Sequence, residues 1–307
     1  MTTKLIQGRQ VMRPETSPLT SSILDHATVG PDVPGFGWQN NTGLWPSYNC
    51  LNTLVSTHLC PDPLAAKPVK SFAFGGWVPA FEFAVYGAVQ CSNVGLDEED
   101  MRSELKRVFA LNEGKGIEAA LKATRFVAQA ASGDPTDRLK NVAWDAPVDL
   151  TPGTTPSMVV ALALLEGYAA SVYAGVPTIH MPRAAGTVLE GHGLIVWQGN
   201  KAFTKNGSKV AMGGGYDTLD EMLSGILPMY ATGEVYVEKS EEVDVNAYVL
   251  HGDGLVTETA SGNNFTDNSQ LALAERMFRV AVDCFTAKAT GSIASAGAEG
   301  GGGGFGI

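Results

Sequence analysis

The chain has 307 residues, enough for one large domain or two closely joined ones. Charged residues make up only 17%, below the ~25% of typical soluble domains, so either a partner subunit covers part of the surface or the chain has an enlarged monomeric core. The net charge of −11 argues against a reader of nucleic acid, which needs Lys and Arg to displace counterions from phosphates. It does not argue against a container for nucleic acid.

Residues 1–65 are interrupted by many prolines and glycines, and their apolar residues come in small groups such as Ile23–Leu24. This pattern is typical either of a loop-rich domain edge or of an extended arm that lies on neighbouring subunits. In the second case Trp38, Trp45 and Tyr48 would be buried against another chain.

Residues 66–95 are rich in β-favouring aromatic and branched side chains. Gly75–Gly76 lies between two such runs and is expected to form a turn. The pattern predicts a β-hairpin or a long two-stranded loop, which continues into a strand near Phe81–Cys91.

A long helix is expected to begin at Asp97, because the acidic run Glu98–Asp100 would lie at the positive end of its dipole. If continuous to Ala131, the helix would be roughly 50 Å long at ~1.5 Å per residue. Gly114 and Gly116 could instead divide it into two helices. We expect one long element.

A second helix is expected over Ser157–Ala174, with Thr155 as N-cap and Pro156 at the first helical position. It is apolar on most faces, and a helix that is apolar all round is buried. Its length, together with Glu166 and Gly167, argues against a membrane span.

From Val176 onward the apolar residues recur with a period near two, which predicts strands separated by Gly- and Asn-containing turns. A short helix is expected over Ala184–Glu190. The expected strands are Val176–Met181, Leu194–Gln198, Lys209–Met212, Glu234–Lys239, Val243–Leu250 and Arg276–Phe285. This succession predicts the α+β class. The glycine-rich tail Ser292–Ile307 is expected to be ordered only by a neighbouring subunit.

The four cysteines form no C-x-x-C pair, and Met1–Arg13 contains no apolar core of a secretory signal. We therefore expect a reducing compartment and free thiols. The five histidines are not spaced as metal ligands, and His180 and His192 fit hydrogen-bonded structural roles better. No nucleophile elbow, phosphate loop or zinc-protease motif is present, so we expect no catalytic, cofactor-binding or metal site and no enzyme.

For three groups of residues, two here and one in the next paragraph, a functional interpretation stands beside the structural one. Glu113 and Glu118 could form a general acid/base pair, but a solvated helix face explains them better. The residues Ser171, His180 and Asp217 could meet in space, although nothing in the sequence prepares them for catalysis.

Asp217, Asp220 and Glu221 form an acidic cluster before Met222. The N-terminus of a helix is a sufficient explanation for this cluster. A weak cation site is the alternative.

The order of these elements resembles that of tailed-phage major capsid proteins of the Hong Kong 97 fold, which encapsulin shells share. Phe81–Gly87 (FEFAVYG) and Leu96–Asp100 resemble the entry to the spine helix in capsid proteins of phages of actinobacteria. Stretches that resemble the axial domain and the return of the peripheral domain are Thr178–Arg183 (TIHMPR), Gly214–Asp217, Ala231–Val235 and Leu273–Arg276.

The resemblance implies the following division: 1–65 N-terminal arm, 66–95 extended hairpin loop and entry strand, 96–150 spine helix and peripheral domain, 151–233 axial domain, 234–291 return strands of the peripheral domain, and 292–307 glycine-rich tail. It implies hexamers and pentamers that close into an icosahedral shell around double-stranded DNA. The chain would then belong to the virion and assemble in the cytoplasm of the host bacterium.

The partners implied are further copies of the chain, a portal and a separate scaffolding protein, with packaged DNA nearby, no cofactor and no membrane. Lys67 and Lys70 lie in the hairpin region, but no partner asparagine can be assigned, so no covalent cross-link is expected. The alternatives are an encapsulin-type compartment that stores an enzyme, an enzyme such as a hydrolase with an unrecognised site, and a decoration or tail protein.

Overall fold

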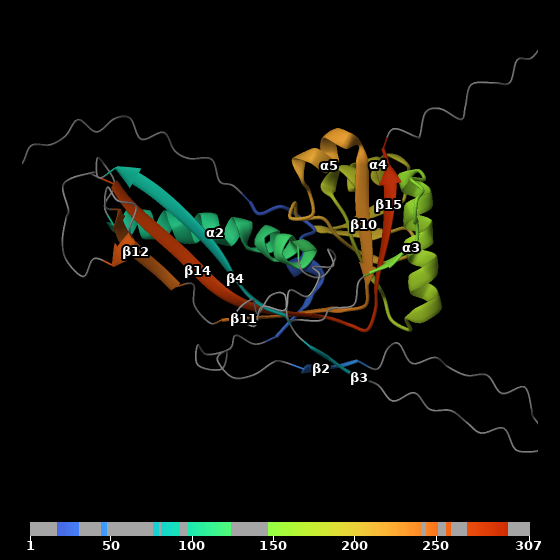
Figure 1. Ribbon diagram of the computed structural model, residues 1–307, viewed down its shortest axis with the longest axis horizontal. Helices are drawn as coiled ribbons and strands as arrows, with labels where there is room; N and C mark the ends of the chain where they lie inside the picture. The colour runs from blue at the N-terminus through green and yellow to red at the C-terminus, as the bar shows by residue number, and fades with distance from the viewer. Residues whose placement is uncertain are drawn as a thin grey trace, which may run out of the picture.

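The computed structural model describes residues 17–30, 44–47, 76–79, 81–92, 98–123, 147–240, 244–250, 256–258 and 269–293. Most of these residues form two lobes, each built on one β-sheet (Figure 1). We call them the long-strand lobe, a six-stranded sheet covered by helix α2 (Glu98–Leu121), and the compact lobe, a seven-stranded sheet with helices α3, α4 and α5. The expectation of an α+β fold is confirmed.

The long-strand lobe is organised around β14 (Ser269–Val282). β4 (Phe81–Ser92) pairs with one edge of β14, and β11 (Val235–Lys239) and β12 (Asp244–Leu250) pair in succession with the other, all antiparallel. The outer strands are β1 (Thr28–Val29) and β13 (Val256–Glu258). α2 lies along this sheet, so the lobe is long and two layers thick (Figure 1).

Helix α2 runs without a break through both glycines up to Leu121. The alternative of two helices divided at Gly114 and Gly116 is therefore wrong, while residues 124–131 lie outside the described part. A Cβ atom added at Gly116 would lie 2.5 Å from Cγ1 of Val85 on β4. Gly116 thus lets the helix approach the sheet closely.

We expect Gly116→Ala to lower the free energy of unfolding by about 1–3 kcal/mol, because the added methyl overlaps the stiff side chain of Val85. Val85→Ala in the same chain should recover part of this loss. The control is Gly167→Ala on α3, where no atom lies within 4 Å of the added Cβ; helix propensity predicts a gain of about 0.5–1 kcal/mol there. Urea unfolding measures the unfolding free energy of all three variants. Equal changes for Gly116→Ala and Gly167→Ala would contradict close packing of α2 against β4.

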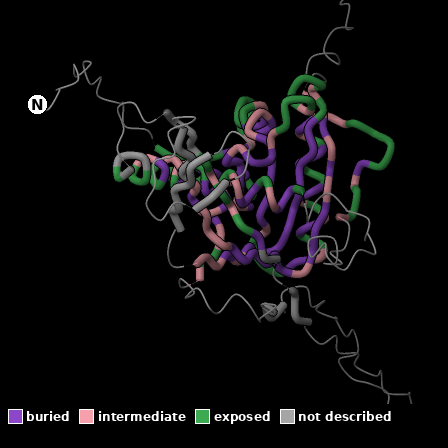
Figure 2. The backbone as a smooth tube through the Cα atoms, turned by 60° about the vertical axis from the view of Figure 1, so that its left-hand side comes forward, coloured by how far each residue is buried: buried purple, intermediate pink, exposed green. Residues whose placement is uncertain are grey.

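The compact lobe has the spatial strand order β5-β15-β10-β6-β9-β8-β7. The strands are β5 (Val148–Asp149), β6 (Thr178–His180), β7 (Ile195–Gln198), β8 (Lys201–Thr204), β9 (Lys209–Ala211), β10 (Ile226–Thr232) and β15 (Thr286–Ser292). The helices are α3 (Met158–Val172), α4 (Arg183–Gly191) and α5 (Leu219–Ser224). α3 packs against β10 and β15, and the buried backbone concentrates in this sheet (Figure 2).

Helix α3 differs from the expectation in two ways. Its N-cap is Ser157, whose Oγ accepts a hydrogen bond from the N–H of Val160, rather than Thr155. Only one side of the helix is buried, since the side chains of Val160 and Leu164 are 48% and 40% exposed. The expectation of a helix buried all round is wrong because the sheet covers one face only.

Four strands of the compact lobe were not expected, among them the two-residue β5. β10 has a continuous apolar run without alternation, because both of its faces are buried after Ile226. β8 is short, and β15 (TAKATGS) has few β-branched residues. The expected strand Arg276–Phe285 stops at Val282, and Cys284, with a φ of 29°, lies in the turn before β15.

The expected turn at Gly75–Gly76 is wrong. Gly76 is the first residue of β3 (Gly76–Pro79), which pairs antiparallel with β2 (Leu44–Ser47) of the proposed arm. The remainder of the hairpin region before Gly75, most of the arm and the tail after Ile293 lie outside the described residues.

Cys284 is disulfide-bonded, so the expectation of free thiols is wrong for this residue. Among the helices that the structure describes, none is long and apolar enough to cross a membrane.

Candidate functional site

A buried carboxylate joins the two lobes and the segment 17–30. Oε1 of Glu118, on α2, accepts hydrogen bonds from the backbone N–H groups of Ile23 and Gly213, and Oε2 accepts one from Gly215, each at 2.9 Å. The side chain is fully buried. A Cβ atom at Gly215 would lie 2.3 Å from the carbonyl oxygen of Lys115, so only glycine lets this loop reach α2. We call the contact between α2, the segment 17–30 and the loop after β9 the junction.

Burial raises the pKa of Glu118 from 4.5 to about 7, against the lowering effect of the three N–H donors. Glu113, one turn earlier, is also nearly buried and forms an ion pair of 2.7 Å with Arg276 of β14. The expectation of a solvated helix face for Glu113 and Glu118 is therefore wrong. The two carboxylates also have separate partners, which does not favour an acid/base pair.

The segment 17–30 is fixed to the compact lobe by Ser21, a residue in the left-handed region with a φ of 58°. Its Oγ donates to the carbonyl oxygen of Val210 at 2.6 Å and accepts from the N–H of Ala202 at 2.9 Å. Nε2 of His26 lies 2.9 Å from Oγ of Ser21. Because the hydroxyl hydrogen is already used, His26 donates through Nε2. Burial lowers the pKa of His26 to about 4.

His180 lies at the centre of the compact sheet and is fully buried. The Thr232 hydroxyl donates to the Gly233 carbonyl, so Nε2–H of His180 donates to Thr232 Oγ1 at 2.8 Å. Its Nδ1 then accepts from the Tyr216 hydroxyl at 2.7 Å. The neutral ring is thus fully satisfied, and burial lowers its pKa to about 3. The expectation of a hydrogen-bonded structural histidine is confirmed.

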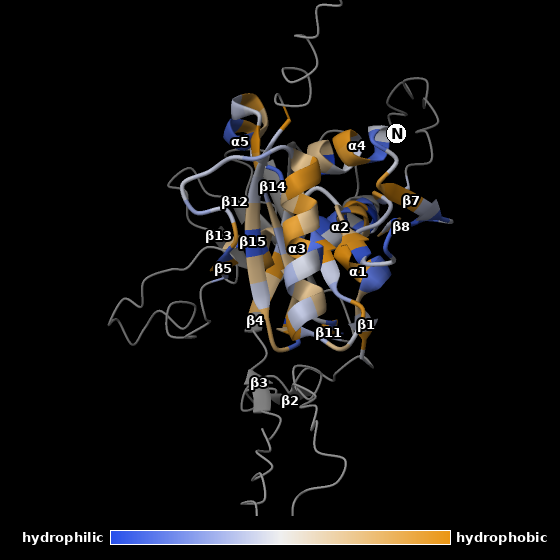
Figure 3. Ribbon diagram, turned by 90° about the vertical axis from the view of Figure 1, so that its right-hand side faces the viewer, coloured by the Kyte–Doolittle hydropathy of each residue, from blue (hydrophilic) through white to orange (hydrophobic). Residues whose placement is uncertain are grey.

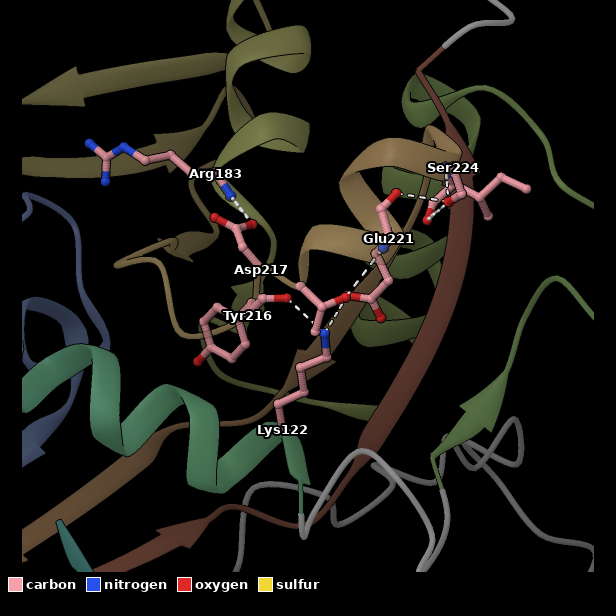
Figure 4. A network of polar contacts seen from close by, with 8 residues as sticks. Lys122, Arg183, Tyr216, Asp217, Glu221 and Ser224 are labelled. Carbon is pink, nitrogen blue, oxygen red and sulfur yellow. Dashed lines mark hydrogen bonds and ion pairs between the residues drawn. The ribbon is translucent and has the colours of Figure 1, made fainter. Parts of the chain in front are cut away.

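The acidic cluster before Met222 is the first turn of a helix. Thr218 is the N-cap of α5 and accepts from the N–H of Glu221. Glu221 binds Lys122 at 2.5 Å, and Lys122 also donates to the carbonyl oxygen of Tyr216 (Figure 4). The cation near the cluster is therefore Lys122, which directly follows α2. No group of three His, Cys, Asp or Glu in the described part of the chain is arranged to hold a metal ion.

Arg183 completes the junction at the start of α4. Its backbone N–H donates to Asp217 Oδ1 at 3.0 Å (Figure 4), and its guanidinium donates to the carbonyl oxygens of Met212 and Thr20. Burial is the main cause that raises the pKa of Asp217. One arginine thus connects α4, the loop after β9 and the segment 17–30.

The structure does not bring Ser171, His180 and Asp217 together. Ser171 is exposed and donates to the carbonyl oxygen of Tyr168, while His180 and Asp217 have the partners given above. His192 is exposed at the C-cap of α4. The arrangement around Glu118, Ser21 and Arg183 is that of a polar connector, in which side chains hold backbone groups of other segments.

Apolar surfaces lie elsewhere on the compact lobe. The outer side of α3 exposes Val160 and Leu164 beside a groove of about 680 Å³, whose walls include Ala163, Gly167 and Leu194. Figure 3 shows the apolar character of this helix. The only charged side chain of α3, Glu166, is held by Thr204, Asn206 and Ser208.

Sequence reasoning noticed Glu118 but gave it the wrong environment. The local signal was the run Gly213–Gly215, whose N–H groups are free to face an acceptor because no side chain shields them. Nothing in the sequence indicates that this run contacts α2, since Glu118 precedes Gly213 by 95 residues.

Phage structures are among the solved structures that the chain matches. The chain matches the "Cyanophage Pam1 capsid asymmetric unit" with 8% identity and a TM-score of 0.48, over 96% of this chain and 98% of that one. A structure from Mycobacterium phage Bobi matches with 14% identity and a TM-score of 0.48, over 91% and 93%. One from Microbacterium phage Oxtober96 matches with 17% identity and a TM-score of 0.45, over 94% and 95%.

No protein-family model and no curated protein matches the chain. The first of these structures is described as a phage capsid, and the other two come from a Mycobacterium phage and a Microbacterium phage. Similarity at these values assigns no function, which therefore rests on the residues of this chain.

Proposed function

We propose that the chain is the major subunit of a tailed-phage capsid, which self-assembles into an icosahedral shell around double-stranded DNA. In this proposal the long-strand lobe is the peripheral domain with α2 as its spine helix, and the compact lobe is the axial domain. The hexamers, pentamers, scaffolding protein and portal that the sequence resemblance implies belong to the same proposal.

The observation that carries self-association is the outer side of α3. A helix exposed to water normally has charged residues on that side, yet Val160, Ala163, Leu164 and Gly167 are all exposed here and none is charged. An uncharged helix face of this kind is expected to be covered by another chain.

The junction supports the same role. A shell wall must hold its two lobes at a fixed angle, because small angular differences between copies set curvature. Glu118, Arg183 and Lys122 connect the lobes through buried hydrogen bonds and an ion pair rather than through a flexible linker. A thin two-layer lobe fixed to a compact one is suited to tile a surface.

Electron microscopy of particles formed by the expressed chain tests the proposal. We expect closed hollow shells with five-fold vertices, and nuclease-resistant DNA in particles isolated from phage-producing cells. Shells that contain a protein cargo and no DNA would instead indicate an encapsulin-type compartment. A monomer with hydrolase activity would contradict both shell functions.

A further inference from the structure

Helix α5 exposes its large apolar side chains to solvent. Leu219 and Leu223 are 65% and 77% exposed, and Met222 and the adjoining Ile226 are exposed as well. None of the residues of α5 is buried. Of its two acidic residues, Glu221 turns toward Lys122 and Asp220 is exposed (Figure 4). A surface helix normally shows the opposite arrangement, so the apolar side of α5 is built to meet another apolar surface.

The α3 groove is a concave surface on the same lobe with a largely apolar lining. Its polar wall residues Asn206 and Ser208 donate hydrogen bonds to Glu166. Its walls include Leu162, Ala163, Gly167 and Leu194, and small side chains on α3 leave the room of about 680 Å³. Val160 and Leu164 extend the apolar area beside it. The groove has space for large side chains, which α5 presents.

The two surfaces lie on opposite sides of the compact sheet. Leu227 and Met229 of β10 pack in the core beneath α3, whereas Tyr230 of the same strand packs with α2 residues. α5 is on the α2 side, where Glu221 reaches Lys122. Figure 1 shows β10 and β15 between α5 and α3. One chain therefore cannot close this contact on itself.

Charged residues beside the two surfaces favour a contact of α5 with the groove over a contact of α5 with another α5. Lys205 is exposed and directly precedes Asn206 of the groove wall, so the chain carries a cation next to the groove. Asp220, exposed on α5, is an anion beside the apolar residues. Opposite charges beside the two surfaces favour α5 against the groove and disfavour α5 against another α5.

We propose that the apolar side of α5 in one copy docks into the α3 groove of the next copy, head to tail. This rests on the proposed function and names the contact within a capsomer. Two different surfaces on opposite sides of a lobe make a heterologous contact, which closes into a ring when the rotation permits. Four apolar side chains bury less surface than the ~800 Å² per partner of a stable pair. We therefore expect the contact to be stable in a closed ring and not in an isolated dimer.

Cysteine cross-linking in assembled particles tests this contact. The variant Leu223→Cys/Ala163→Cys should give, under mild oxidation, a ladder of covalent multimers that ends at five or six subunits. Leu223→Cys alone and Ala163→Cys alone should give no more than the wild-type background from its native cysteines. The matched control pair is Leu223→Cys/Glu99→Cys, with position 99 exposed on α2, and it should give no ladder.

Leu223→Asp supplies an independent measurement. A charge in the apolar groove should raise the protein concentration needed for assembly at least tenfold, and the exposed position should leave the circular dichroism spectrum unchanged. Covalent dimers from Leu223→Cys alone would overturn the proposal, because α5 would then meet α5. Normal shells without the ladder would overturn this contact and leave the shell function standing. Failure of the wild-type chain to associate at all would overturn both.

Discussion

Replacing Glu118 by alanine is expected to lower the free energy of unfolding of the unassembled chain by about 3–5 kcal/mol. The change leaves the N–H groups of Ile23, Gly213 and Gly215 buried without an acceptor, and each such group costs about 1–3 kcal/mol. Relief from burying a charge offsets part of this loss. Urea unfolding followed by circular dichroism measures the effect.

Glu99→Ala is the control on the same helix, since Glu99 is exposed and its loss should cost less than about 1 kcal/mol. Equal losses for Glu99→Ala and Glu118→Ala would contradict the junction. Glu118→Gln keeps one acceptor oxygen and should be less damaging than alanine.

Glu118→Gln also isolates the pH dependence of the unfolding free energy that Glu118 causes. The pKa of Glu118 is raised from 4.5 to about 7 in the folded chain, so between these values the folded chain holds a proton that the unfolded chain has lost. This contribution to stability falls as pH rises from 4.5 to 7, by up to about 3 kcal/mol. The difference in unfolding free energy between the wild type and Glu118→Gln should shrink by that amount over this range.

The second large effect is the loss of stability in acid caused by His180. The pKa of His180 is lowered from 6.5 to about 3 by burial, so below pH 6.5 the unfolded chain takes up a proton that the folded chain resists. The unfolding free energy therefore falls as pH drops from 6.5 to 3, by up to about 5 kcal/mol. His26, with its pKa lowered to about 4, acts in the same direction, while Glu118 opposes both.

His180→Gln removes this titration. Near pH 5 its unfolding free energy should depend on pH less steeply than that of the wild type, by about 1.4 kcal/mol per pH unit. His192→Gln is the matched control for the loss of an exposed histidine. An equal change in both variants would show that burial of His180 is not the cause.

The sequence predicted elements whose signals are local. The acidic run at the start of α2 indicated a long helix, and the cluster Asp217, Asp220 and Glu221 indicated the N-terminus of a helix where α5 begins. β10 was missed because burial on both faces removes the alternation that marks a strand. β15 was missed because its place between β5 and β10 comes from pairing over long sequence distances.

The junction could not be predicted for the same reason. Whether a glutamate on α2 meets water or three N–H groups depends on where Ile23 and the loop Gly213–Gly215 lie in space. The expected absence of catalytic and metal residues stays a prediction. The proposed division into arm, hairpin loop, peripheral and axial domains and tail also stays a proposal. The structure adds that β15, all but its last residue within 234–291, pairs with β10 of the compact lobe.

Sedimentation velocity on the purified chain over a range of concentrations tests self-association, the central claim, most directly. The account predicts species of five or six times 32.2 kDa, or closed shells of many copies, and loss of these species in Leu223→Asp. A single 32.2 kDa species at every concentration, from a chain that is folded by circular dichroism, would contradict it.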